Sequence, residues 1–140
     1  MILNLFVKKL SNAIPINTWF LSKRPSVIFH PLWHGFGEIE VLDEDDELLV
    51  NFGNFTHGHF SCHNEKLSPE ERENRIADNL IEFLQDVFAD RVEFYGSLKG
   101  GGGYRYLDAK STPHCANFYA KTYLWSGIKS KQGHPKNPVP

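Results

Sequence analysis

Two absences place the first limits on this 140-residue sequence. Cysteine occurs only at Cys62 and Cys115, which is too few for a disulfide-stapled scaffold and is typical of a reducing, cytosolic setting. One bridge between these two cysteines stays open as an alternative. No apolar run approaches the roughly 18 residues that a transmembrane helix needs, so we expect no membrane partner.

The N-terminus is apolar but lacks the order of a secretory signal. Lys8 and Lys9 follow its apolar run instead of preceding it, and no A-x-A-like cleavage site comes after. We therefore expect this segment to belong to the mature protein, and we expect a cytoplasmic location.

Short motifs with a known catalytic mechanism are also missing. The sequence contains no G-x-S-x-G, H-E-x-x-H, C-x-x-C or G-x-G-x-x-G pattern. The glycine run at 100–103 follows Lys99, whereas a phosphate-binding loop places its lysine after the glycines and before a helix. A non-catalytic protein is the favoured interpretation.

The clearest element that is present is a helix over residues 68–90. Ser68 and Glu71 match an S-x-x-E capping box, and Pro69 suits the first helical position. Apolar residues at helical spacing form one stripe, made of Ile76, Leu80, Phe83, Leu84, Val87 and Phe88. Such a stripe must be buried, and the neighbouring segments suggest a sheet as its partner.

Alternation and turn residues predict strands on both sides of this helix. The expected strands are 27–29, 36–42, 47–52, 55–62, 91–97, 104–108 and 117–126, with turns or loops at 43–46, 53–54 and 100–103. Apolar spacing over residues 3–13 predicts a short helix that ends before Pro15.

These elements predict an α+β fold. We expect an antiparallel sheet of about five to seven strands, with the long helix packed on one face and a short N-terminal helix. Residues 1–126 are expected to form a single domain. Residues 127–140 are polar, basic and rich in proline, so they are predicted to form a flexible tail.

The net charge of −2 conceals a strong asymmetry. Residues 36–95 hold sixteen acidic and four basic side chains, whereas the segments on either side are basic. Five of the acids are consecutive at a predicted hairpin tip: Asp43, Glu44, Asp45, Asp46 and Glu47. Charge blocks usually become solvated faces. The alternative is that Asp43, Glu44, Asp45 and Asp46 attract a basic protein partner.

A histidine pair suggests a second kind of site. His57 and His59 share one face of a predicted strand and could converge on zinc or another transition metal. His114 is the third ligand that we name, although His30, His34 and Cys115 are not excluded by spacing. The simpler interpretation is a polar strand face with solvated histidines.

The predicted C-terminal strands are rich in aromatic residues. Tyr119, Tyr123 and Trp125 share one face of the 117–126 strand, with basic residues among them. Such a face could stack nucleic-acid bases, which makes nucleic acid a weaker candidate partner than protein. Tyrosine and lysine are also ordinary on a half-exposed sheet face.

The favoured function is therefore a non-catalytic interaction module that binds a macromolecular partner through its acidic or its aromatic face. No cofactor is expected under this hypothesis. The alternative is a small metal-binding protein or metal-dependent enzyme that uses His57 and His59.

Overall fold

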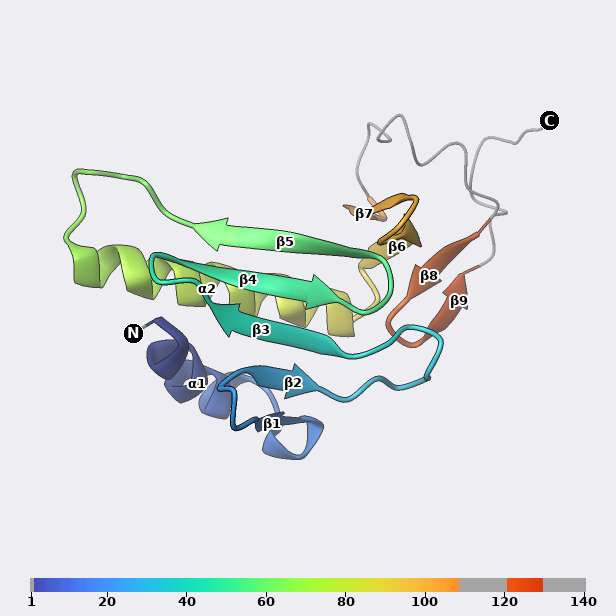
Figure 1. Ribbon diagram of the computed structural model, residues 1–140, viewed down its shortest axis with the longest axis horizontal. Helices are drawn as coiled ribbons and strands as arrows, with labels where there is room; N and C mark the ends of the chain where they lie inside the picture. Colours follow the sequence, from blue (N-terminus) through green and yellow to red (C-terminus); the bar gives the residue numbers. More distant parts are fainter. Residues whose placement is uncertain (1, 109–120, 130–140) are drawn as a thin grey trace.

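The computed structural model describes residues 2–108 and 121–129, and its fold is α+β, as predicted (Figure 1). Two helices and nine strands lie in the described residues. In chain order they are α1 (Ile2–Ala13), the 3-10 helix η1 (Ile16–Thr18), β1 (Trp19–Leu21), β2 (Val27–Phe29), β3 (Ile39–Asp43), β4 (Glu47–Phe52), β5 (Thr56–Ser61), α2 (Pro69–Phe88), β6 (Val92–Ser97), β7 (Gly101–Tyr106), β8 (Thr122–Leu124) and β9 (Gly127–Lys129).

Strands β1 to β5 form an antiparallel meander, here called sheet A, in which each strand pairs with its neighbour in the sequence. The register places Val41 opposite Val50 and Ile39 opposite Phe52, and all four side chains are buried. Residues between them, such as Glu40 and Asn51, are less buried. This alternation gives sheet A one apolar face, which the two helices cover (Figure 1).

Helix α2 begins at the predicted capping box. The Ser68 hydroxyl oxygen accepts a hydrogen bond from the Glu71 backbone N–H at 3.1 Å, and the Glu71 carboxylate accepts from the Ser68 N–H at 3.0 Å. The predicted stripe packs against sheet A, and its members Leu80, Leu84 and Val87 have no exposed surface. The helix ends where Asp90 adopts the left-handed conformation, with a φ of 61°.

Helix α1 packs beside α2, and the two run in the same direction (Figure 1). Ile2, Leu3, Phe6 and Leu10 are buried on the face toward the core, at the spacing expected of an amphipathic helix. The N-terminal ends of both helices therefore lie at one end of the molecule, and both C-terminal ends lie at the other.

The remaining strands form a second sheet, here called sheet B, with the order β7–β6–β8–β9. The sequence predicted one sheet, whereas the chain builds two. The predicted loop at 100–103 is also wrong, because Gly101–Gly103 belong to β7. A Cβ atom on Gly102 would overlap with the Phe55 carbonyl oxygen. The glycines therefore let sheet B approach the start of β5, which a larger residue would prevent.

The predicted tail at 127–140 and the predicted strand at 117–126 are only partly covered by the described residues. Gly127–Lys129 form β9 in a hairpin with β8, so the predicted tail does not begin at residue 127. Within the described residues the predicted 117–126 strand is β8 alone, at 122–124. Residues 109–120 and 130–140, which include most of the predicted tail, lie outside the described residues.

Candidate functional site

The acidic turn between β3 and β4 is partly committed to the fold. One carboxylate oxygen of Asp43 accepts a hydrogen bond from the Leu3 N–H at the start of α1, at 2.9 Å. The other oxygen accepts from the Asp45 N–H within the turn, also at 2.9 Å. Asp43 thus satisfies a backbone donor at a helix N-terminus, where negative charge is favourable. This contact explains one of the five consecutive acids.

The tip residues beyond Asp43 are free of such contacts. Glu44, Asp45 and Asp46 are exposed, and their side chains make no hydrogen bond or ion pair within residues 2–108 and 121–129. Asp45 has a φ of 69°, a conformation that aspartate tolerates better than most residues. The backbone thereby turns sharply and presents neighbouring carboxylates to solvent.

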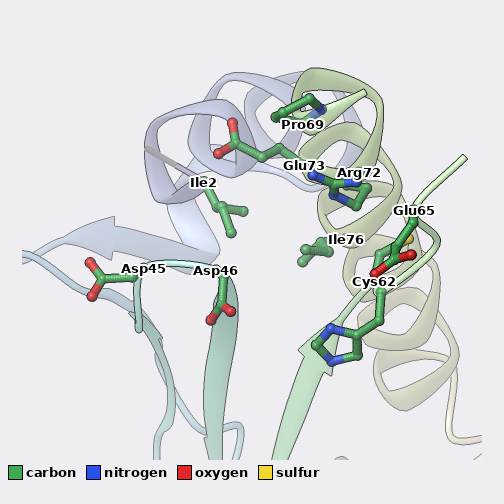
Figure 2. Close-up of a pocket in the computed structure, with 10 residues that line it drawn as sticks. Ile2, Asp45, Asp46, Cys62, Glu65, Pro69, Arg72, Glu73 and Ile76 are labelled. Carbon is green, nitrogen blue, oxygen red and sulfur yellow. The ribbon is translucent and has the colours of Figure 1, made fainter. Parts of the chain in front are cut away.

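A cavity of about 390 Å³ opens beside this tip. Strands β3 and β5 run in the same direction, so the β3–β4 turn and the loop after β5 lie at the same end of the strands of sheet A. The first turns of α2 and the first residue of α1, Ile2, complete the walls. In Figure 2, Asp45 and Asp46 lie on one side of the cavity, and Glu65 lies on the other.

The walls of the cavity are acidic and its floor is apolar. Asp45, Asp46, Glu65 and Glu73 contribute four carboxylates, against one guanidinium from Arg72. With His63 neutral, the lining carries a formal charge of −3. Buried Ile2 and Ile76 lie between the acids (Figure 2). We call this feature, defined by the four acids and the two isoleucines, the acidic cavity.

Arg72 does not neutralise the carboxylates at contact distance. Its guanidinium donates hydrogen bonds to the backbone carbonyl oxygens of Leu67 and Asn64, at 2.8 Å and 3.3 Å. These bonds fasten the loop between β5 and α2 to the helix. The same helix start carries Glu71 outside the cavity, where the backbone N–H of Ser68 lowers the pKa of the Glu71 carboxyl.

Two potentially reactive side chains, Cys62 and His63, also line the cavity. The Cys62 thiol is free. No hydrogen bond joins these two side chains in the described part of the chain, although a nucleophile and its base need such a contact. The arrangement therefore offers charge and shape to a ligand, without an assembled nucleophile.

The predicted metal pair lies elsewhere, on the face of sheet A that turns away from the helices. The rings of His57 and His59 are 5.3 Å apart between centroids, and His59 is hydrogen-bonded through Nδ1 to Glu47. Among the described residues, no group of three or more His, Cys, Asp or Glu is placed to hold one ion. The third ligand that the sequence suggested, His114, lies outside the described residues, as does Cys115.

Only part of the predicted aromatic face lies within the described residues. Tyr119 lies outside the described residues. Tyr123 is half-buried and its ring stacks on that of Trp33, with centroids 5.9 Å apart. Trp125 is 5% exposed and packs edge-on against Phe36 at 5.1 Å. Both described rings thus contribute packing between sheet B and the core, and Trp125 adds almost no surface.

Sequence reasoning found the acidic tip but missed its counterpart across the cavity. Glu65 was only a member of the acidic middle segment, Glu73 lay in the predicted helix at 68–90, and Ile2 lay just before the predicted helix at 3–13. The predicted strand order did contain a signal, because alternate strands of an antiparallel meander run in the same direction and finish at the same end of the sheet. Applied to the predicted strands, this rule would have placed the turn at 43–46 beside the loop at 62–67, a step that the sequence analysis did not take.

Neither described helix combines the length and apolarity required to cross a bilayer. Comparison of the chain with protein-family models, with curated proteins and with solved structures finds no match.

Proposed function

We propose that this protein is a small, non-catalytic interaction module of the cytosol, and that the acidic cavity receives a lysine or arginine side chain of a protein partner. One observation carries the proposal: acidic residues from the β3–β4 turn, the loop after β5 and helix α2 line the same cavity.

The shape of the cavity suits a long basic side chain. Lysine and arginine carry an aliphatic stem that packs on apolar surface while the charged head stays among polar groups. Pro69 and Cys62, which keep exposed surface above the buried Ile2 and Ile76, would contact the stem, and Asp46 and Glu73 would receive the head. A planar guanidinium can bind two carboxylate oxygens at once, so arginine is the preferred guest.

The surrounding charge supports the same class of partner. Glu44 and Glu70 are exposed, and each is next in the sequence to a residue that lines the cavity. Segment 36–95 is strongly acidic overall. A field of one sign around a concave site speeds the approach of oppositely charged partners, and salt weakens this effect. Binding should therefore be faster in about 0.01 M salt, where the Debye length is about 30 Å, than in about 0.15 M salt, where it is about 8 Å.

The test compares two variants with the same change in net charge. The cavity variant carries Asp45→Asn, Asp46→Asn and Glu73→Gln. The control variant carries Glu38→Gln, Glu82→Gln and Asp108→Asn, three exposed acids that do not line the cavity. Each immobilised protein is incubated with a lysate of the cells in which the protein naturally occurs. The association rate of each captured partner is then measured in low and moderate salt.

We expect the wild type and the control variant to capture the same basic partner, and the cavity variant to lose it. A chemical cross-link from Asp46 or Glu73 to a lysine of that partner would locate the contact. Equal capture by both variants, or capture of partners without a basic surface, would show that the acidic cavity is only a solubilising feature.

A further inference from the structure

A second cavity, of about 360 Å³, lies at the opposite end of the two helices. Ile14 directly follows α1 and Phe88 is the last residue of α2, and both line this cavity. Phe29, at the end of β2, and Trp125, in the β8–β9 turn, form other walls. Four separate elements of the fold therefore position the lining.

The aromatic walls are held in place by the core. Phe29 is 1% exposed and Trp125 is 5% exposed, so both rings belong to the core and back the cavity, whose accessible apolar surface comes from Pro15, Leu32 and Phe88. The ring of Phe88 joins them, with its centroid 5.2 Å from that of Phe29 and 5.0 Å from that of Trp125. Side chains locked in this way form a preorganised surface, which lowers the entropic cost of binding.

The lining differs from the acidic cavity in having no aspartate, glutamate, lysine or arginine. Its polar side chains are those of Asn17, Thr18 and His30. The Thr18 hydroxyl donates to the Pro15 carbonyl oxygen at 2.6 Å. The side chains of Asn17 and His30 make no hydrogen bond within the described residues, so each can bond to a guest.

We propose that this apolar cavity, lined by Pro15, Leu32 and Phe88 over a buried backing of Ile14, Phe29 and Trp125, binds a compact uncharged molecule with an aromatic ring and one hydroxyl or N–H group. An ionised guest would lose its hydration without gaining a charged partner, which is unfavourable. The volume lies near the lower end of the range of roughly 300–1,000 Å³ for small-molecule sites, which fits one or two rings. The single polar group would bond to Asn17 or His30.

The experiment uses the full chain with defined probes. Indole and p-cresol are neutral, while benzylamine and benzoate carry opposite charges on a ring of similar size. Binding is followed by NMR shifts of the Trp125 indole N–H and the Phe88 backbone N–H. We expect saturable shifts with indole and p-cresol, and binding at least about tenfold weaker with both charged probes.

Two variants at matched positions locate the site. Leu32 lines the cavity and is 66% exposed, and Leu98 lies in the β6–β7 turn and is 57% exposed. Both tolerate a polar substitution because neither contributes to the core. Leu32→Glu places a carboxylate at the cavity and should weaken indole binding at least about tenfold, whereas Leu98→Glu should leave it unchanged.

Three outcomes would overturn the proposal. The first is the absence of saturable shifts with either neutral probe. The second is a preference for benzylamine, which would mean that the negative C-terminal ends of the two helices select a cation instead. The third is a Leu32-dependent dimer without probe binding, which would make this cavity a protein interface. None of these outcomes bears on the acidic cavity.

Discussion

Replacing Phe83 with alanine should test the architecture most directly, because this ring joins the two sheets through helix α2. Phe83 is 8% exposed. Its ring centroid lies 5.6 Å and 5.7 Å from those of Phe52 and Phe60 in sheet A. It also lies 5.0 Å and 6.0 Å from those of Tyr104 and Tyr106 in sheet B. Truncation would leave a void among four aromatic neighbours that cannot all collapse into it.

Buried phenylalanine-to-alanine changes cost about 3–5 kcal/mol, and Leu80→Ala, at a fully buried position of the same helix, should cost about 2–5 kcal/mol. Unfolding entropy of about 2.1 cal/mol/K per residue gives about 0.3 kcal/mol/K for this chain. A loss of about 3 kcal/mol should therefore lower the melting temperature by about 10 °C. Urea unfolding followed by circular dichroism measures the free energy directly, provided that the m-value is unchanged.

The matched control is Asn79→Ala, since Asn79 is exposed on the same helix and alanine favours helix formation. Its free energy of unfolding should stay within about 0.5 kcal/mol of the wild type. Changes below about 0.5 kcal/mol at both Phe83 and Leu80 would refute the reasoning, because the helical stripe would then not be buried.

Two further predictions concern individual contacts. Asp43→Ala should lower the free energy of unfolding by about 0.5–2 kcal/mol, because the Leu3 N–H at the start of α1 loses its acceptor. The control Asp46→Asn, measured by the same urea titration, should change this free energy little. Equal losses for the two variants would contradict this account. Burial, followed by the hydrogen bond to Asp86, raises the pKa of Tyr106 to about 12 from 10.0. Since the unfolded state releases this proton first, stability should be fully retained below about pH 10 and fall between about pH 10 and pH 12. Tyr106→Phe should flatten that alkaline decline in urea midpoints, and an unaltered decline would assign it to other groups.

Features set by local sequence were predictable from the chain alone. The capping box at Ser68 needs only residues within one helical turn, and the β3–β4 hairpin needs only alternation on both sides of an acidic turn. Both formed as predicted. The helical stripe also identified five of the seven buried residues of α2, because a period of 3.6 residues defines one face whatever it packs against; it omitted Ala77 and Ile81 and included the partly buried Phe88.

Features set by distant contacts were not predictable. The close approach of Gly102 in sheet B to the Phe55 backbone beside sheet A joins residues that are far apart in the sequence. A run of glycines usually indicates a loop, whereas Gly101–Gly103 pair with Tyr95–Ser97 of β6 and so extend β7. The acidic cavity likewise combines residues from α1, the β3–β4 turn and α2, and no single stretch of sequence contains that combination.

The sequential strand order of sheet A has a consequence for synthesis on the ribosome. Each of β2 to β5 pairs with the strand made just before it, so the meander can assemble stepwise as the chain emerges. Helix α1 is made first, yet it packs against α2, whose first residue lies more than fifty positions later. Until α2 has left the ribosome, the apolar face of α1 lacks that cover. The nascent chain should therefore be most vulnerable to aggregation, and most dependent on chaperones, in the interval before residue 88 appears.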